Sequence, residues 1–522
     1  MNNTVVLAAD LSLPNLDYKA LAPMLILFGA ASIGVLVEAF VPRRGRHSVQ
    51  FGLSLLALLG ALVTVILMAR SGRVVTTAGV AVSIDHVALF LQGTLIALGI
   101  VVLLLIAERA LETGGPFVAQ AAITVGSEAD RRQASASGST EAFPLSLFAL
   151  AGMMLFVSAN DLLTMFVALE VFSLPLYLLC ALARRRRLVS QEAALKYFLL
   201  GAFASAFFIF GMALLYGFSG SVRLGDIHRT AVAANTPSTA LLFTGVAMLA
   251  VALLFKIAAV PFHVWTPDVY QGAPTPVTAL MAACTKVAAF GGLLRVLYVA
   301  VDWVQWDIEP ILGTIAILTM LVGAILAVTQ TDIKRLLAYS SIANAGYVLV
   351  GALSFDREGV RSTLFYLAAY GFTVIAAFAV ITLVRDEDGE ATHLSRWAGL
   401  GRRSPLVAGI FTFLMLAFAG IPLTSGFISK FAVFSAALGN RGPWQIALVI
   451  AGVLSSIVLV FPYLRVVVLM YLSEPAENTP TVMVPGAFTS AALMVGVLAT
   501  LVLGVFPQPV LNLVDTAALF QR

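Results

Sequence analysis

Three lysines and one glutamate lie deep within long apolar stretches of this sequence, and their residue types suit proton transfer. Lys256 lies within residues 253–258 and Lys286 about 11 residues into another apolar run, while Lys430 and Glu170 lie within two more. At 1.5 Å per helical residue, Lys286 is about 16 Å deep, close to the middle of a bilayer. A charge there costs at least about 2.5 kcal/mol, so such groups face protein or water and are functional candidates.

Lysine is suited to proton handling in such surroundings. Burial lowers the pKa of an ammonium group because it disfavours the charged form, and an approaching carboxylate raises that pKa again. We therefore expect Glu170 to pair with Lys256, and a movement between them to change which lysine prefers the proton. Lys286 and Lys430, at similar depth, could then pass protons along the membrane plane. Moving one charge against 100 mV requires about 2.3 kcal/mol, which a shift of two pKa units can supply.

Five further ionisable residues in apolar runs indicate proton transfer less clearly. Lys196 lies near the start of its run, four residues after Glu192, so an i,i+4 ion pair also explains it. His263 follows Pro261, where a hydrogen-bonded histidine and a proton carrier are both reasonable. Interfacial contacts near the end of a span explain three others: Glu38, Arg295 and Arg465.

Membrane-spanning helices must position these residues. Of the 522 residues, 60% are hydrophobic and only 11% are charged, whereas soluble domains are about 25% charged. A soluble protein could not bury so much apolar surface in one or two cores. About 14 apolar runs predict spans, at 21–41, 51–69, 85–107, 143–158, 161–183, 193–218, 239–260, 275–301, 309–328, 335–354, 361–384, 405–436, 444–472 and 484–506.

Two prolines are placed where they should break a membrane helix. Pro261 directly follows span 7 and Pro422 lies within span 12. A proline lacks the backbone donor and clashes with the preceding turn. We therefore expect broken helices 7 and 12, with freed carbonyls and water near Lys256 and Lys430.

A faint repeat relates the two breaks. Residues 194–197 are similar to 363–366, and residues 259–262 are similar to 420–423, each pair five spans apart. A unit of five helices used twice has opposite orientations in the membrane, as in many transporters. We predict an all-α polytopic membrane protein with two inverted five-helix repeats, spans 4–8 and 9–13.

This pattern divides the chain into five predicted regions. A polar loop with a low-complexity stretch interrupts the spans, and we expect it to be flexible and without chemistry. The regions are a three-span region at 1–107, the loop at 108–142, the repeats at 143–301 and 309–472, and a last span and tail at 484–522.

Basic residues predict the orientation. Loops after odd-numbered spans hold more lysine and arginine than loops on the other side, and they include the run 184–187 of four arginines. Cytoplasmic loops are enriched in such residues. An even number of spans then places both termini on the non-cytoplasmic side. No cleavable signal is expected, because the first basic residue is Lys19.

Several function classes are excluded by what the sequence lacks. No phosphate-binding or dinucleotide-binding glycine motif is present. Cys180 and Cys284 lie in apolar runs and cannot form a disulfide framework, a cysteine zinc site or an iron–sulfur cluster. Only His263 and His86 approach membrane depth, too few for a haem. The net charge of +4 comes from loop residues and does not indicate nucleic-acid binding.

Residues 255–274, FKIAAVPFHVWTPDVYQGAP, closely resemble the antiporter-like membrane subunits of respiratory complex I, the proton-pumping NADH:quinone oxidoreductase. Similarity extends over nearly the whole chain. The ending YQGAP at 270–274 and the lysine at 430 are similar to the N-type subunit rather than to the L and M types. The loop at 108–142 is longer than this resemblance leads us to expect.

The resemblance implies roles for individual residues. Glu170 and Lys256 would form the charge pair, Lys286 and Lys430 would continue the route, and Lys196 would also take part. Redox chemistry would be carried by other subunits, so no cofactor or metal is expected in this chain. The implied neighbours in the cell membrane are subunits K and M.

Two other functions remain open. The chain could belong to an Mrp-type cation/proton antiporter, although the YQGAP ending argues against it. It could instead be a structural bridge that does not pump. A lysine without a partner at the centre of a span argues against a bridge, because leucine would be more stable there.

Overall fold

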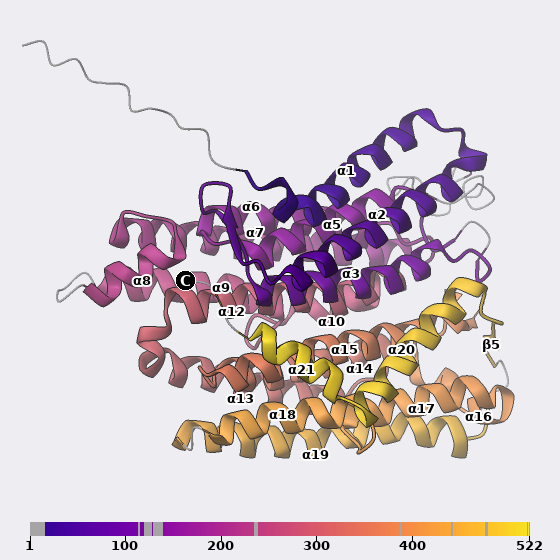
Figure 1. Cartoon of the computed structure of the whole chain (residues 1–522). Helices are drawn as coiled ribbons and strands as arrows, with labels where there is room; N and C mark the ends of the chain where they lie inside the picture. The colour runs from indigo at the N-terminus through magenta and orange to yellow at the C-terminus, as the bar shows by residue number, and fades with distance from the viewer. Residues whose placement is uncertain are drawn as a thin grey trace, which may run out of the picture.

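The computed structural model describes residues 16–112, 115–118, 128, 139–233, 239–386, 389–439, 442–475, 479–518 and 520. Most of these residues are helical, and the long helices lie roughly side by side (Figure 1). The predicted N-terminal tail and most of the predicted 108–142 loop, with its low-complexity stretch, lie outside the described residues.

The N-terminal region contains three long helices and one hairpin. Asp17 and Asp85 begin the first and third helices by accepting hydrogen bonds from backbone N–H groups of the first turn, as good N-cap residues do. The elements are α1 (Tyr18–Phe40), α2 (Arg43–Ser71), β1 (Val75–Thr77), β2 (Val82–Ile84) and α3 (His86–Ala107), with β1 and β2 antiparallel.

The middle region holds the first break. Its helices are α5 (Ala142–Ser158), α6 (Leu162–Cys180), α7 (Arg187–Ser219), α8 (Leu224–Ala233), α9 (Thr239–Ile257), α10 (Trp265–Gly272), α11 (Thr275–Leu280) and α12 (Lys286–Arg295). Two π-helical turns, Met281–Thr285 and Val296–Ala300, flank α12. A 3₁₀ turn at Asp302–Val304 follows.

The last region holds the second break. Its elements are α13 (Gln305–Val328), α14 (Ile333–Ala352), α15 (Arg357–Leu383), β3 (Val384–Asp386), β4 (Gly389–Glu390), a 3₁₀ turn (Leu394–Trp397), α16 (Leu400–Arg403), α17 (Pro405–Ala419), α18 (Ser425–Gly439), α19 (Pro443–Leu472), β5 (Thr481–Val482), α20 (Ala487–Val505) and α21 (Gln508–Ala517). Strand β3 pairs with both β4 and β5, antiparallel in each case.

The predicted all-α membrane fold is confirmed. Each predicted apolar run coincides with one helix or with consecutive helices. Within the described residues, 11 helices are long and apolar enough to cross a membrane, and α5, α17 and α18 are shorter apolar helices. The number of crossings and the inverted repeats stay predictions. The short strands and the small helices α8, α16 and α21 were not predicted.

Both predicted helix breaks are present. Helix α9 ends at Ile257 and α10 begins at Trp265; α17 ends at Ala419 and α18 begins at Ser425. Gly420 caps α17 with a φ of +84°, a left-handed conformation that glycine adopts without strain. The chain therefore turns away from the helix axis at the end of α9 and again at the end of α17, as the two prolines predict.

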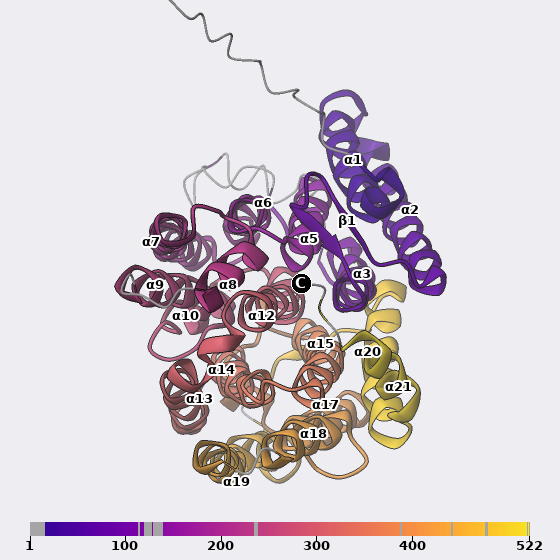
Figure 2. The same cartoon turned by 60° about the vertical axis from the view of Figure 1, so that its left-hand side comes forward.

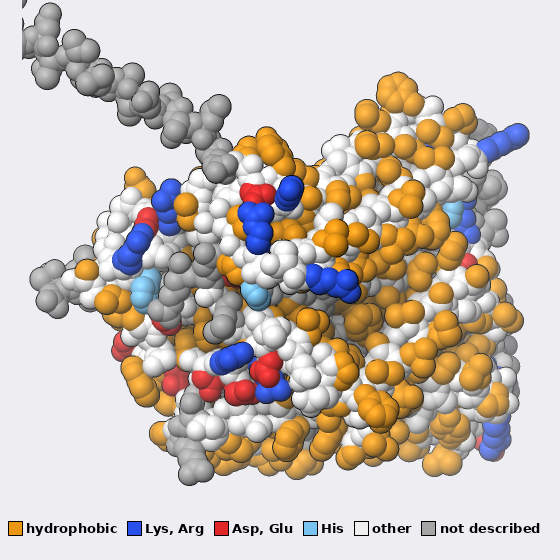
Figure 3. All heavy atoms as spheres, viewed as in Figure 1, with side chains coloured by type: hydrophobic (Ala, Val, Ile, Leu, Met, Phe, Trp, Pro, Cys, Tyr) orange, Lys and Arg blue, Asp and Glu red, His pale blue; other side chains and the backbone are white. Residues whose placement is uncertain are grey.

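The most deeply buried helices lie at the centre of the molecule. All residues in the most apolar stretch of Thr275–Ala300 are buried, and 94% of those in the corresponding stretch of α15 are buried. In α2 only 28% of the residues in this stretch are buried. Figure 2 shows α12 and α15 inside a ring of the other helices. Figure 3 shows hydrophobic side chains over most of the face between the helix ends, as lipid contact requires. A charged side chain on α12 is therefore enclosed by protein.

Candidate proton-transfer site

The amine of Lys256 lies in an aromatic cage near the end of α9. Its side chain is 2% exposed. Nζ donates a hydrogen bond of 2.7 Å to the hydroxyl of Ser173 on α6. The ring centroids of Phe172, Tyr177 and Tyr197 lie 5.3, 5.5 and 5.5 Å from Nζ. This cage can attract a cation without supplying a negative charge.

The first helix break encloses this cage. Trp265, the first residue of α10, donates a hydrogen bond of 3.0 Å to the carbonyl of Phe255. Its indole stacks on Tyr197, with ring centroids 4.7 Å apart. The same carbonyl also accepts a 3.1 Å bond from the backbone N–H of Ala258, so the last turn of α9 and the first residue of α10 meet at one acceptor beside Lys256. Residues 255–274 therefore supply Trp265, which packs against the aromatic cage and holds Tyr197 in place.

Glu170 does not pair directly with Lys256, contrary to our expectation. Its carboxylate is partly buried and accepts a hydrogen bond from Ser205 of α7. Within the described residues, no hydrogen bond or ion pair joins Glu170 to Lys256. The hydroxyl that Lys256 contacts belongs to Ser173, one turn beyond Glu170 on α6, and residues three apart share a helix face. Glu170 is therefore near the cage but is bound to another helix.

Lys286 is buried between three central helices. It is 3% exposed and directly follows the π-helical turn Met281–Thr285. Nζ donates to the backbone carbonyl of Ser341 on α14 and lies 5.4 Å from the ring centroid of Tyr370 on α15. Such π-turns are frequent at functional sites. Burial at the centre of the molecule confirms that this amine does not face lipid.

Lys430 is bound by the carbonyls that the second break frees. The side chain is 7% exposed, and Nζ donates bonds of 3.1 Å to the carbonyls of Phe418 and Ala419. These are the last residues of α17, and the C-terminal end of a helix attracts a cation. The ring centroid of Tyr347 lies 4.8 Å from Nζ. The expectation that a broken helix presents carbonyls to a lysine is confirmed here.

Polar side chains lie between Lys286 and Lys430. A cavity of about 10 Å³, about the room for one water molecule, borders Lys430. Tyr370, whose ring faces Lys286, also lines this cavity. Tyr366 and Asn344 line it too, and the Tyr366 hydroxyl donates a 2.6 Å bond to the Asn344 side chain. A single water molecule could therefore connect the surroundings of the two lysines.

Two of the predicted residues lie apart from this row. Lys196 is 42% exposed and forms ion pairs of 2.7 Å with Glu192 and 2.8 Å with Asp268. Asp268 also pairs with Arg335 of α14, at 2.6 Å. His263 is partly buried in the turn after α9, and no hydrogen bond or ion pair among the described residues joins it to a lysine. The i,i+4 pair of Lys196 is confirmed.

Sequence reasoning missed the buried ion pair of Asp85 and Arg295. Arg295 is fully buried and donates two bonds, of 3.0 and 2.9 Å, to the carboxylate of Asp85. Arg295 lies five residues before Ala300, near the end of its span as expected, but its side chain is buried in an ion pair rather than exposed at an interface. The two residues lie 210 positions apart in the chain. The only local signal in the sequence is that Asp85 directly precedes an apolar run. The pair joins the start of α3 to α12, nine residues beyond Lys286.

The other two residues near span ends behave as expected. Arg465 donates a 3.3 Å bond to the carbonyl of Val328, the last residue of α13. Glu38 pairs with Arg46 at 3.0 Å and is partly exposed. Both are explained by contacts near the ends of helices.

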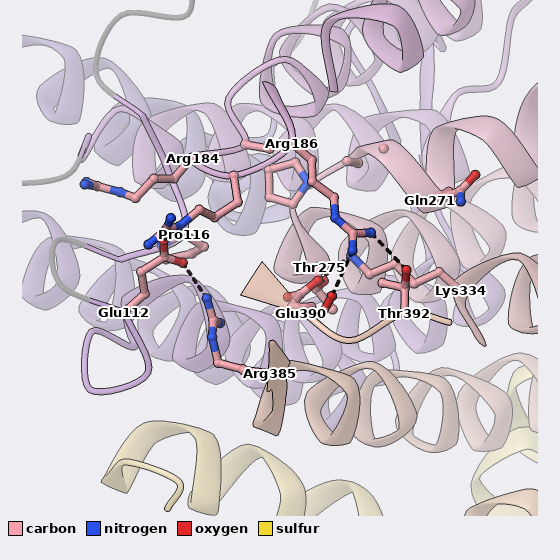
Figure 4. Close-up of a pocket in the computed structure, with 15 residues that line it drawn as sticks. Glu112, Pro116, Arg184, Arg186, Gln271, Thr275, Lys334, Arg385, Glu390 and Thr392 are labelled. Atoms are coloured by element: carbon pink, nitrogen blue, oxygen red, sulfur yellow. Dashed lines mark hydrogen bonds and ion pairs between the residues drawn. The ribbon is translucent and has the colours of Figure 1, made fainter. Parts of the chain in front are cut away.

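A charged pocket lies where α11 and α14 begin (Figure 4). It has a volume of about 60 Å³. Glu390 accepts a 2.5 Å bond from Thr275, the first residue of α11, and pairs with Lys334 of α14 at 2.6 Å. Burial opposes the charge on Glu390, but Lys334 and Arg385 hold its pKa below the usual value. Basic residues dominate the wall: Arg184, Arg185, Arg186, Lys334 and Arg385.

Comparison with known proteins gives the family. The family described as NADH:quinone oxidoreductase/Mrp antiporter, TM, matches residues 159–456, which include both breaks and all four central candidates. The chain belongs to this family. The resemblance of residues 255–274 to antiporter-like subunits is thereby confirmed.

Relatives of this family are similar over almost the whole chain. NADH-quinone oxidoreductase subunit N of Salinispora arenicola is 66% identical over 98% of this chain and 100% of its own length. The subunit N of Rhodococcus opacus is 56% identical over 99% and 98%. A chain of respiratory complex I from Thermus thermophilus is 33% identical with a TM-score of 0.75, covering 94% of this chain and 98% of that one.

An Mrp complex chain from Dietzia has the same fold. It has a TM-score of 0.79 and is 22% identical, covering 95% of this chain and 97% of its own. At this identity the similarity shows the fold alone. Membership of the N-type branch rests on the curated relatives.

Proposed function

We propose that this chain is a proton-translocating subunit in the membrane arm of an NADH:quinone oxidoreductase, with the redox chemistry carried by other subunits. One observation supports this most: three fully enclosed lysine amines, at two helix breaks and one π-turn, in a chain 66% identical to a subunit N. Placing a charged amine at membrane depth costs at least about 2.5 kcal/mol, so stability does not explain three buried lysines. Their place in the fold favours proton transfer over a structural role.

The proposed route has two parts. In the first, Glu170 leaves Ser205 and approaches Lys256, which then holds its proton more strongly; when Glu170 returns, Lys256 gives up this proton, which passes along the row to Lys286. In the second, Lys286 and Lys430 exchange a proton through Tyr370 and the water-sized cavity. The residues proposed to act are Glu170, Lys256, Lys286 and Lys430, with Lys196 and His263 as outer candidates.

We place the Glu390 pocket on the cytoplasmic side, because the arginine run 184–186 lines it. Both termini then face the other side of the cell membrane. Subunits K and M are the proposed neighbours. The pocket abuts α11 and α14, the helices that lead to Lys286 and to Ser341, so it is the proposed point of water access.

The experiment is proton translocation by the assembled complex in inverted membrane vesicles. Lys256→Ala should lower the protons moved per NADH oxidised, and Lys19→Ala, at an exposed position, should not. Subunit content of the purified complex shows whether assembly is intact. An unchanged ratio for Lys256→Ala in an intact complex would refute the proposal and would favour the bridge.

Cation/proton antiport is the second candidate, because the matching family model covers Mrp antiporters as well as NADH:quinone oxidoreductases. It predicts cation-dependent proton exchange in vesicles that lack NADH. Exchange that persists without the redox subunits would favour antiport over the main proposal.

A further inference from the structure

Each of the three buried lysine amines lies against the face of a tyrosine ring. Lys256 faces Tyr177, Lys286 faces Tyr370 and Lys430 faces Tyr347, at 5.5, 5.4 and 4.8 Å from Nζ to the ring centroid. Three different helices supply these tyrosines. The recurrence at three separate positions points to a shared purpose.

None of the three amines forms an ion pair with a carboxylate in the part of the chain that the structure describes. Their hydrogen-bond acceptors are neutral: the Ser173 hydroxyl, the Ser341 carbonyl, and the two carbonyls at the end of α17. Neutral acceptors only partly replace water around an ammonium group. The negative face of an aromatic ring attracts a cation, most strongly where water is excluded.

We propose that Tyr177, Tyr370 and Tyr347 are positioning residues whose ring faces hold the protonated lysines in place of a counter-ion. This inference rests on the proposed function. A carboxylate in contact attracts an ammonium group more strongly than a ring does. A ring face therefore stabilises the protonated form of the amine, but weakly enough that the amine can release its proton.

The packing around the rings holds their faces toward the amines. Tyr177 contacts Gly201 so closely that a Cβ there would overlap the tyrosine hydroxyl. Its ring meets that of Tyr197 edge-on, with centroids 4.7 Å apart. On the other side of the molecule, the Tyr347 hydroxyl bonds to Ser455 and Ser456 of α19, at 3.0 and 3.2 Å. Close packing against a glycine and hydrogen bonds to two serines thus fix the orientation of these two rings.

Tyr347 offers the sharpest test, because one ring alone lies over Lys430, whereas Lys256 has three. Within the described residues, the titratable side chains that face Lys430 or share its cavity are tyrosines: Tyr347 on α14, and Tyr366 and Tyr370 on α15. A change of ring electrons at position 347 therefore alters the field at Lys430 with no acid or base added.

The experiment replaces Tyr347 with phenylalanine and with mono-, di- and trifluorophenylalanine in the assembled complex. Fluorine withdraws electrons from the ring face and changes its size little. Tyr347→Phe should keep proton translocation within about twofold of the wild type. Each added fluorine should lower it further, to about a tenfold loss for the trifluoro ring.

Two results would overturn the inference. Equal translocation along the fluorine series would show that the ring only packs, and loss in Tyr347→Phe itself would assign the task to the hydroxyl. Lys430→Ala separates these outcomes from failure of the proposed function. If that variant pumps normally, the route is wrong; if it does not pump while the fluorine series is flat, only the ring assignment fails.

Discussion

At the residue scale, the three buried lysines differ in what binds them. Lys430 has two carbonyls at a helix end, Lys286 one carbonyl inside α14, and Lys256 a hydroxyl and three rings. A helix C-terminus favours a cation through its dipole, whereas a hydroxyl is a weaker acceptor. Lys256 therefore depends most on the carboxylate nearby, which makes Glu170 the residue whose charge matters most.

Removing the charge of Glu170 should stop the first part of the route. Glu170→Gln keeps an acceptor for Ser205 but cannot raise the proton affinity of Lys256. We expect proton translocation to fall at least about tenfold, the effect of one or two pKa units, with an assembled complex. Glu358→Gln, which removes an exposed carboxylate of α15 outside the route, is the control and should leave translocation unchanged. Normal translocation by Glu170→Gln would show that Lys256 does not need a mobile carboxylate.

At the element scale, the position of Lys286 depends on how α12 is anchored. The Asp85–Arg295 pair joins α12 to α3, and both side chains are almost fully buried. Removing one partner of a buried pair leaves an uncompensated charge, which costs about 3–5 kcal/mol. Sequence spacing predicts the depth of Lys286 on this helix but not the anchor.

Asp85→Leu should therefore lower the thermal stability of the purified complex, and Asp85→Leu with Arg295→Met should restore much of it. Replacing a buried pair by apolar residues of similar volume is often neutral. The measurement is the midpoint of thermal unfolding of the complex in detergent. If the double variant is no more stable than Asp85→Leu, the pair is not the anchor that we infer.

The second helix break should be sensitive to a single methyl group. A Cβ at Gly426 would overlap the carbonyl of Ala417, whereas a Cβ at Gly409 of α17 would meet nothing within 4 Å. Gly426→Ala should push α18 from α17 and destabilise the chain by about 1–3 kcal/mol, as overpacking does. Gly409→Ala should be neutral or stabilising, because glycine within a helix is unfavourable. Thermal unfolding of both variants would test this, and equal midpoints would contradict it.

At the scale of the whole molecule, the Glu390 pocket joins the middle region and the last region of the chain on one face. Thr275 belongs to the middle region, and Lys334 and Glu390 to the last. The pKa of Glu390 is held below its ordinary value of 4.5. Its ionised form therefore stabilises the folded chain above that ordinary value, and this contribution is lost as the pH falls through the lowered folded pKa.

This linkage predicts a difference in acid stability. The wild-type complex should lose thermal stability as the pH falls below about 4.5. Glu390→Gln should be less stable than the wild type at neutral pH, and its stability should change less as the pH falls below that value. Glu358→Gln, at an exposed position, is the control and should follow the wild type. Parallel curves for Glu390→Gln and the wild type would show that the charge of Glu390 does not stabilise the folded chain.

The sequence contained enough to predict the class of fold and the residues at depth. Long apolar runs require helices, and Pro261 and Pro422 must break them. It could not predict the partners. The contacts of Lys286 with Ser341, of Lys430 with the end of α17, and of Asp85 with Arg295 join distant segments, and their geometry arises only from packing. No local sequence signal marks the π-turn before Lys286, because this turn also arises from packing between distant segments.

The most direct test of the account is the number of protons translocated per NADH oxidised by the intact complex with Lys286→Ala. Lys286 is the central amine, enclosed by α12, α14 and α15, where it contacts the Ser341 carbonyl and the Tyr370 ring. We predict a lower ratio than in the wild type, with subunit composition unchanged. The same ratio in both complexes would contradict a proton route through the buried lysines.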